Sequence, residues 1–185
     1  MKNRFLTLVA CSLFTIVQSQ ITFKPGVKLG LNISKIENVN DDKRNGIYFG
    51  VIGEFNFLNI SNYCLQPEIS YSQQGTKNNQ QDFFVITLAN KIYFTDSEYG
   101  FYAILAPSVD IKLNGPKEVI NTSGSRVELG SDYGMLGGFG YEFSFGLGIE
   151  TRYKFSLKSD KSDDAGSSLG KNSSIQMGLT YKFDF

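Results

Sequence analysis

The chain has 185 residues, enough for one domain, and its Lys and Arg residues equal its Asp and Glu residues at 18 each. This balance argues against nucleic acid as a partner. The sequence contains no His, so the commonest general base and metal ligand are absent, and a conventional Ser-His-Asp triad is excluded.

The N-terminal segment predicts export. Lys2 and Arg4 precede an apolar run from Phe5 to Val17, and small and polar residues follow. This layout is typical of a secretory signal peptide, which we place at residues 1–19, with the remaining domain at 20–185. A membrane anchor is the alternative, but the apolar run is short for a span.

A lipoprotein is a second alternative for this segment, because Cys11 follows Leu-Val-Ala. The apolar run continues well past Cys11, where a lipoprotein should turn polar. Signal-peptide cleavage removes Cys11 and leaves only Cys64. We therefore expect no disulfide within the mature chain.

The rest of the chain consists of short segments in which apolar and polar residues alternate. The last of them, SSIQMGLTYKFDF, places every apolar side chain on one face of a strand and every charge on the other. Eight such segments occur, at residues 25–34, 46–57, 63–73, 82–94, 100–113, 132–143, 146–157 and 173–185. Their length and period are typical of strands that cross a membrane in a barrel.

The connections between these segments alternate in length. Long polar connections lie at residues 35–45, 73–81, 114–131 and 158–172, and short ones at 58–62, 95–99 and near Ser144. Long extracellular loops, short periplasmic turns and an even strand number are typical of small outer-membrane barrels. The sequence predicts an all-β, eight-stranded, antiparallel up-and-down transmembrane barrel in the outer membrane of a Gram-negative bacterium.

Several segments carry a resemblance to a known family. They are VKLGLNIS, LQPEISYSQQG, FYAILAPSV, GGFGYEF, ETRYKFSL and GLTYKFDF, in that order along the chain. With them the chain resembles the PorT-like, or outer-membrane-protein β-barrel, family. The resemblance implies a fold and a location rather than an activity. The terminal Tyr181, Phe183 and Phe185 are similar to the signal that the outer-membrane assembly machinery reads, so we expect that machinery as a partner.

The polar faces place charges inside the predicted barrel. The expected lumen charges are Lys28, Lys91, Lys112, Arg152, Lys154 and Lys182, with Glu54, Glu68, Asp110, Glu142, Glu150 and Asp184. An unpaired charge there would be costly, so we expect ion pairs. The planar guanidinium of Arg152 can hold two carboxylates, and we expect them among Glu54, Glu68 and Glu150. The network forms either a structural plug, the commoner case in barrels of this size, or an ion path.

We expect a non-enzymatic protein without catalytic, cofactor or metal residues. The glycine-rich GMLGGFG lies within a strand segment, so it does not indicate a nucleotide site. The predicted role of this monomeric barrel is structural, or interaction through its extracellular loops with an unknown extracellular or envelope protein. One alternative is a narrow pore, transport or secretion-apparatus component. Another is a soluble, periplasmic, lipocalin-like barrel with its apolar residues inside.

Overall fold

The computed structural model describes residues 21–36, 41–57, 60–95, 98–120, 126–128, 130–157 and 172–184. The predicted signal peptide, residues 158–171 and Phe185 lie outside the described residues. Over the described ranges, no helix has the length and apolar character needed to cross a membrane.

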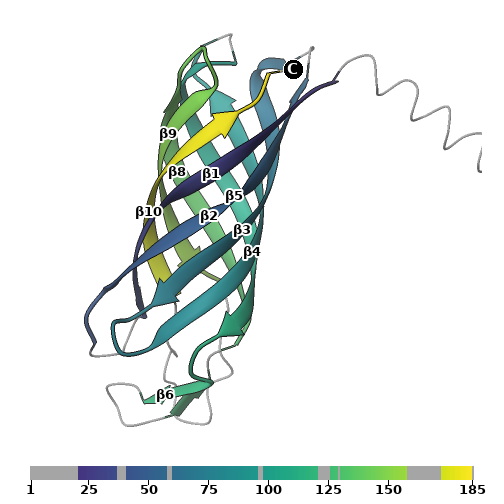
Figure 1. The fold of residues 1–185 in the computed structure, drawn as a ribbon. Helices are drawn as coiled ribbons and strands as arrows, with labels where there is room; N and C mark the ends of the chain where they lie inside the picture. Colours follow the sequence, from purple (N-terminus) through teal and green to yellow (C-terminus); the bar gives the residue numbers. More distant parts are fainter. Residues whose placement is uncertain are drawn as a thin grey trace, which may run out of the picture.

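Eight strands form one closed barrel in which every neighbouring pair is antiparallel. The strands are β1 (Ile21–Ile36), β2 (Arg44–Phe57), β3 (Ile60–Gly75), β4 (Gln80–Tyr93), β5 (Gly100–Asn114), β8 (Asp132–Glu142), β9 (Leu147–Ser156) and β10 (Asn172–Lys182). Strands adjacent along the chain are also adjacent in the sheet, and β1 pairs with β10 to close it (Figure 1). The predicted eight-stranded up-and-down barrel is confirmed.

The two faces of the sheet have opposite chemistry. Large apolar side chains such as Leu31, Val51 and Phe139 are exposed on the outside, whereas Arg152 and Glu68 are buried inside. This is the arrangement of a protein that faces lipid. A lipocalin-like barrel needs the reverse arrangement, so that alternative is wrong.

The inner face also carries an apolar cluster. Its members are Cys64, Ala89, Tyr93, Tyr102, Ile104, Ala106 and Leu136, from β3, β4, β5 and β8. Because β4 contributes Ala89 and Tyr93 to this cluster, the segment at 82–94 is apolar on its inner face as well as its outer face. Apolar packing and charge pairing therefore share the lumen, because the same four strands also carry the buried Glu68, Lys91, Asp110 and Glu142.

The two ends of the barrel differ as the connection lengths predict. The start of β1 and the end of β10 lie at one end, and the small hairpin of β6 (Glu118–Ile120) and β7 (Arg126–Glu128) lies at the other (Figure 1). The sequence did not indicate this hairpin. By the usual orientation of outer-membrane barrels, the hairpin end is extracellular, and the end with the start of β1 and the end of β10 is periplasmic.

One predicted long loop is a tight turn. The connection expected over residues 73–81 shortens because β3 continues to Gly75 and β4 begins at Gln80. Gly75 has a φ of 102°, which favours glycine, and the Thr76 N–H donates to the Asn79 carbonyl at 3.1 Å. The polar residues at the end of β3 and the start of β4 therefore extend these strands on the extracellular side instead of forming a loop.

Inward-facing glycines make room for two buried tyrosines. A Cβ on Gly30 would lie 2.6 Å from Tyr48 Cζ, and a Cβ on Gly178 would lie 1.9 Å from the Tyr48 hydroxyl oxygen. Gly140 lies against Tyr102 in the same way, with a Cβ 2.4 Å from its Cζ. These glycines let aromatic rings fill the lumen.

This packing predicts that Gly178→Ala is destabilising and Gly137→Ala is not. The new methyl group of Gly178→Ala would also meet the Leu29 carbonyl oxygen at 2.8 Å, and such overpacking costs about 1–3 kcal/mol. A Cβ at the outward-facing Gly137 meets nothing within 4 Å. Urea unfolding in detergent micelles measures both variants, and equal stabilities would contradict this account of the lumen.

Candidate functional site

The middle of the lumen is held by the guanidinium of Arg152 on β9. Its Nη1 and Nη2 donate to the two carboxylate oxygens of Glu68 on β3 at 2.8 and 2.7 Å, and Nη2 also reaches Glu150 at 2.9 Å. Lys28 on β1 donates to Glu68 at 2.6 Å and lies 3.9 Å from Glu150. This central cluster of Arg152, Glu68, Glu150 and Lys28 therefore links β1, β3 and β9 across the barrel.

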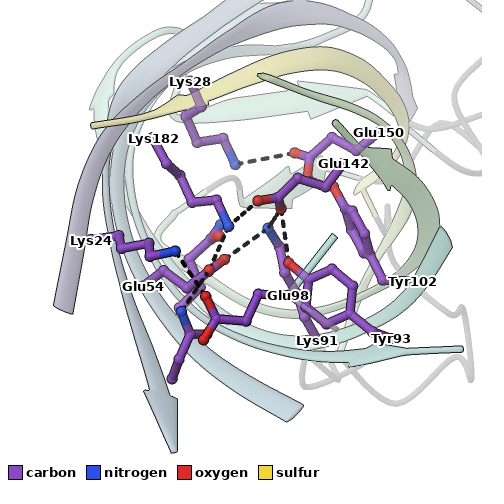
Figure 2. A network of polar contacts seen from close by, with 12 residues as sticks. Lys24, Lys28, Glu54, Lys91, Tyr93, Glu98, Tyr102, Glu142, Glu150 and Lys182 are labelled. Atoms are coloured by element: carbon purple, nitrogen blue, oxygen red, sulfur yellow. Dashed lines mark hydrogen bonds and ion pairs between the residues drawn. The ribbon is translucent and has the colours of Figure 1, made fainter. Parts of the chain in front are cut away.

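A second cluster lies toward the periplasmic end. Lys91 Nζ lies 3.4 Å from Glu54 and 3.7 Å from Glu142, and Lys182 contacts the same two carboxylates. The Tyr93 hydroxyl donates to Glu142 at 2.8 Å, as Figure 2 shows. Two cations and two carboxylates from four strands thus neutralise each other in this periplasmic cluster.

The expected partnership of Arg152 with Glu54 is wrong. The β2–β3 register pairs Ile52, not Glu54, with Glu68. Glu54 therefore lies one inward-facing position nearer the periplasmic end, where it meets Lys91 and Lys182. A single step of strand register decides which cation a carboxylate meets.

Other expected lumen charges have different positions. Lys154 and Asp110 are buried and pair with each other nearer the extracellular end. The half-exposed Lys112 instead donates to the Pro116 carbonyl, and Asp184 is exposed at the chain end. These two residues sit where the strands leave the lumen, so the alternation no longer decides their burial.

Sequence reasoning missed the tyrosines and one ion pair of the lumen. Tyr48 and Tyr102 lie beneath Lys28 and Lys91, with ring centroids 5.1 and 4.6 Å from the ammonium nitrogens. Their inward positions in the alternating segments were the available signal. Lys24 pairs with Glu98 at 2.8 Å across the periplasmic mouth (Figure 2). The sequence does not reveal that pair because Glu98 lies in a turn.

These contacts leave little free space in the lumen. On the extracellular side of the central cluster, a cavity of about 10 Å³ is lined by Lys28, Tyr48, Leu136 and Lys154, among others. That volume holds at most one water molecule. A larger cavity of about 510 Å³ lies at the periplasmic mouth, beside Glu142 and Lys182. Among the described residues, no group of three or more His, Cys, Asp or Glu side chains is placed to hold a metal ion.

At the extracellular end, Asp41 joins two connections. Its carboxylate accepts hydrogen bonds from the Thr76 hydroxyl at 2.5 Å, the Asn78 backbone N–H at 3.1 Å and the Asn78 side-chain amide at 2.9 Å. The Lys77 N–H donates to the Asp42 carbonyl at 3.0 Å. The hydrogen bond from Thr76 is the largest of the influences that lower the pKa of Asp41. Asp41 therefore fixes the β1–β2 connection to the β3–β4 turn.

The sequence profile of the outer membrane protein beta-barrel domain matches residues 18–160, most of the chain. The chain belongs to this family. Membership places the protein in the bacterial outer membrane, the location that the sequence predicts, and agrees with the lipid-facing wall. No curated protein sequence matches the chain.

Solved structures of outer-membrane barrels share the fold of this family member. Ail, the attachment invasion locus protein of Yersinia pestis, matches with a TM-score of 0.52 and 14% identity over 86% of this chain and 98% of Ail. Neisserial surface protein A matches with a TM-score of 0.50 and 11% identity over 88% of this chain and 99% of that protein. Identities this low establish a common architecture and nothing about ligands.

The central cluster predicts non-additive effects of charge removal. Arg152→Met leaves the buried Glu68 and Glu150 with Lys28 as their one cationic contact among the described residues, and stranding buried charge in this way costs about 3–5 kcal/mol. The double variant Arg152→Met/Glu68→Gln removes one stranded carboxylate, so we expect it to be more stable than the single variant. Urea unfolding in detergent compares them, with Lys77→Gln in the exposed turn as control. Equal losses in the single and double variants would contradict the pairing.

The Asp41 contacts predict a pH-dependent extracellular turn. Because the pKa of Asp41 is lowered on folding, its contribution is present above the unfolded pKa and lost as the pH falls through the folded one. We expect the Asn78 amide NMR signal to titrate with a midpoint below the ordinary value of 3.8. Thr76→Val should raise that midpoint, and Asp41→Asn should abolish the titration. A midpoint unchanged by Thr76→Val would show that the hydroxyl does not hold the carboxylate.

Proposed function

We propose that this protein is a closed, non-enzymatic outer-membrane barrel, that its lumen charges are a structural plug, and that its extracellular end is its interaction surface. The observation that carries the proposal is the pairing inside the lumen. Each buried cation of the central and periplasmic clusters contacts carboxylates from other strands. Charges that neutralise each other across the bore hold the strands together and occupy the space that an ion path would need.

The lumen contacts favour a plug over an ion path. An ion that crossed the bore would have to separate Arg152 from Glu68, and both side chains are about 99% buried. Breaking a buried pair is costly because the remaining charge has no water to solvate it. Apolar side chains such as Leu136 and Ile104 fill more of the bore. The space left over above the central cluster fits one water molecule.

The extracellular end supports the interaction role. Binding residues generally lie on loops held by a rigid scaffold. Here the contacts of Asp41 hold the β1–β2 connection against the β3–β4 turn, and the β6–β7 hairpin extends from the β5–β8 connection. The partner is an extracellular or envelope protein in this proposal. A secretion-apparatus role and the narrower PorT-like assignment stay predictions.

We also propose that the C-terminal residues are read during assembly. Tyr181 and Phe183 point outward, exposed, with ring centroids 5.3 Å apart in an edge-to-face arrangement. An exposed aromatic pair at the end of the last strand is accessible before the β1–β10 seam closes. Phe185 and the signal peptide at 1–19 stay sequence-based predictions.

Conductance in planar bilayers tests the closed lumen. We expect the purified barrel to give no stepwise currents in concentrated KCl, because paired charges and tyrosines fill the bore. The variant Arg152→Ala/Glu68→Ala, which removes both sides of the central contact, should conduct and shows that insertion has occurred. Heat-modifiable gel migration checks that both proteins are folded. Steady ion-selective steps from the wild type would favour the pore alternative instead.

A further inference from the structure

Two lysines project from the outer wall of the barrel at its extracellular end. Lys35 lies next to the end of β1, and Lys43 lies just before β2; both are exposed. The β1–β2 register pairs Ser34 with Arg44, so its continuation brings Lys35 opposite Lys43. Neighbouring outward positions on β1 are the apolar Ile33 and Leu31. The lysine pair therefore lies at the extracellular edge of the apolar belt, the band of exposed apolar side chains on the outer wall.

A shallow cavity lies beside this lysine pair. Its volume is about 60 Å³, and it is lined by Lys35, Lys43, Ile33, Ile175, Tyr153 and the serines 173 and 174. The strand registers place Tyr153 next to Ile175, and Ile175 next to Ile33, across β9, β10 and β1. The cavity thus has cationic groups on its extracellular side and aliphatic and aromatic groups on its membrane side.

The charge of this cavity is not balanced by the described part of the chain. No carboxylate there contacts either ammonium group, whereas Lys28, Lys91, Lys154 and Lys182 inside the lumen each contact at least one. Two like charges at facing strand positions repel each other. An anion placed between them would remove that repulsion, and apolar chains attached to it would cover the exposed isoleucines below.

We propose that this lysine cavity binds the phosphate headgroup of an outer-leaflet lipid, whose acyl chains lie along Ile33, Ile175 and Leu31. The head and tail of such a lipid match the two halves of the cavity in the order that the membrane imposes. Ser173 adds a hydroxyl at the junction, where it can donate to a phosphate oxygen. The site lies on the outer wall of the barrel and not in the lumen, so it does not depend on the plug proposed above.

Native mass spectrometry of the folded barrel tests the proposal. The protein is released from detergent containing equal amounts of phosphatidylglycerol and phosphatidylcholine, and the ratio of the two singly lipidated species is measured. We expect the wild type to prefer phosphatidylglycerol. The double variant Lys35→Gln/Lys43→Gln should lower the ratio of phosphatidylglycerol-bound to phosphatidylcholine-bound protein by about five-fold for each lysine removed. Lys77→Gln, an exposed lysine of the same end outside the cavity, should keep the wild-type ratio.

Further arms separate charge, packing and ligand source. Lys35→Arg/Lys43→Arg keeps the charges and should keep the preference, and heat-modifiable migration confirms that each variant is folded. Millimolar inorganic phosphate should not displace the lipid, because it lacks acyl chains. An unchanged ratio in the glutamine variant would overturn the proposal. Displacement by inorganic phosphate would overturn it as well, since the site would then bind a free anion rather than a lipid.

Discussion

The pairing of β1 with β10 is the contact on which the rest of the structure depends. It runs from Gly26 opposite Lys182 to Ile36 opposite Asn172 and turns an open sheet into a barrel. Within lipid no water is available to the edge of a sheet, so a spanning sheet must pair every strand on both sides. Closure fixes which face of each strand meets lipid and which faces inward.

Closure at this size also forces the lumen to be packed. Side chains from opposite walls meet across a narrow bore, so an inward charge finds either a partner or an unsolvated site. The chain meets this constraint in two ways. Arg152 binds Glu68 in a bidentate manner, and Tyr48 fits over the glycines 30 and 178. Charge pairing and ring-against-glycine packing together rigidify the barrel from within.

The strand ends that extend beyond the lipid carry different chemistry from the strand segments within it, because water is available to them. Beyond the lipid the backbone can hydrogen bond with water, so strands can extend, turn or bear charged groups there. On the extracellular side, Asp41 binds the β3–β4 turn, and Lys35 and Lys43 face outward above the apolar belt. Function that depends on contact with other molecules is therefore expected at this end, on a scaffold whose interior is already satisfied.

The sequence by itself determined the strand number, the lipid-facing side of most strands and the inward position of residues such as Arg152, Glu68 and Lys182. Alternation with period two encodes all of these locally. The tertiary structure alone decided the partners. Glu54 meets Lys182 rather than Arg152, and Lys24 meets Glu98, because register and barrel closure bring together residues far apart in the chain. The turn at Gly75 and the β6–β7 hairpin likewise depend on backbone conformations that a polar stretch of sequence does not specify.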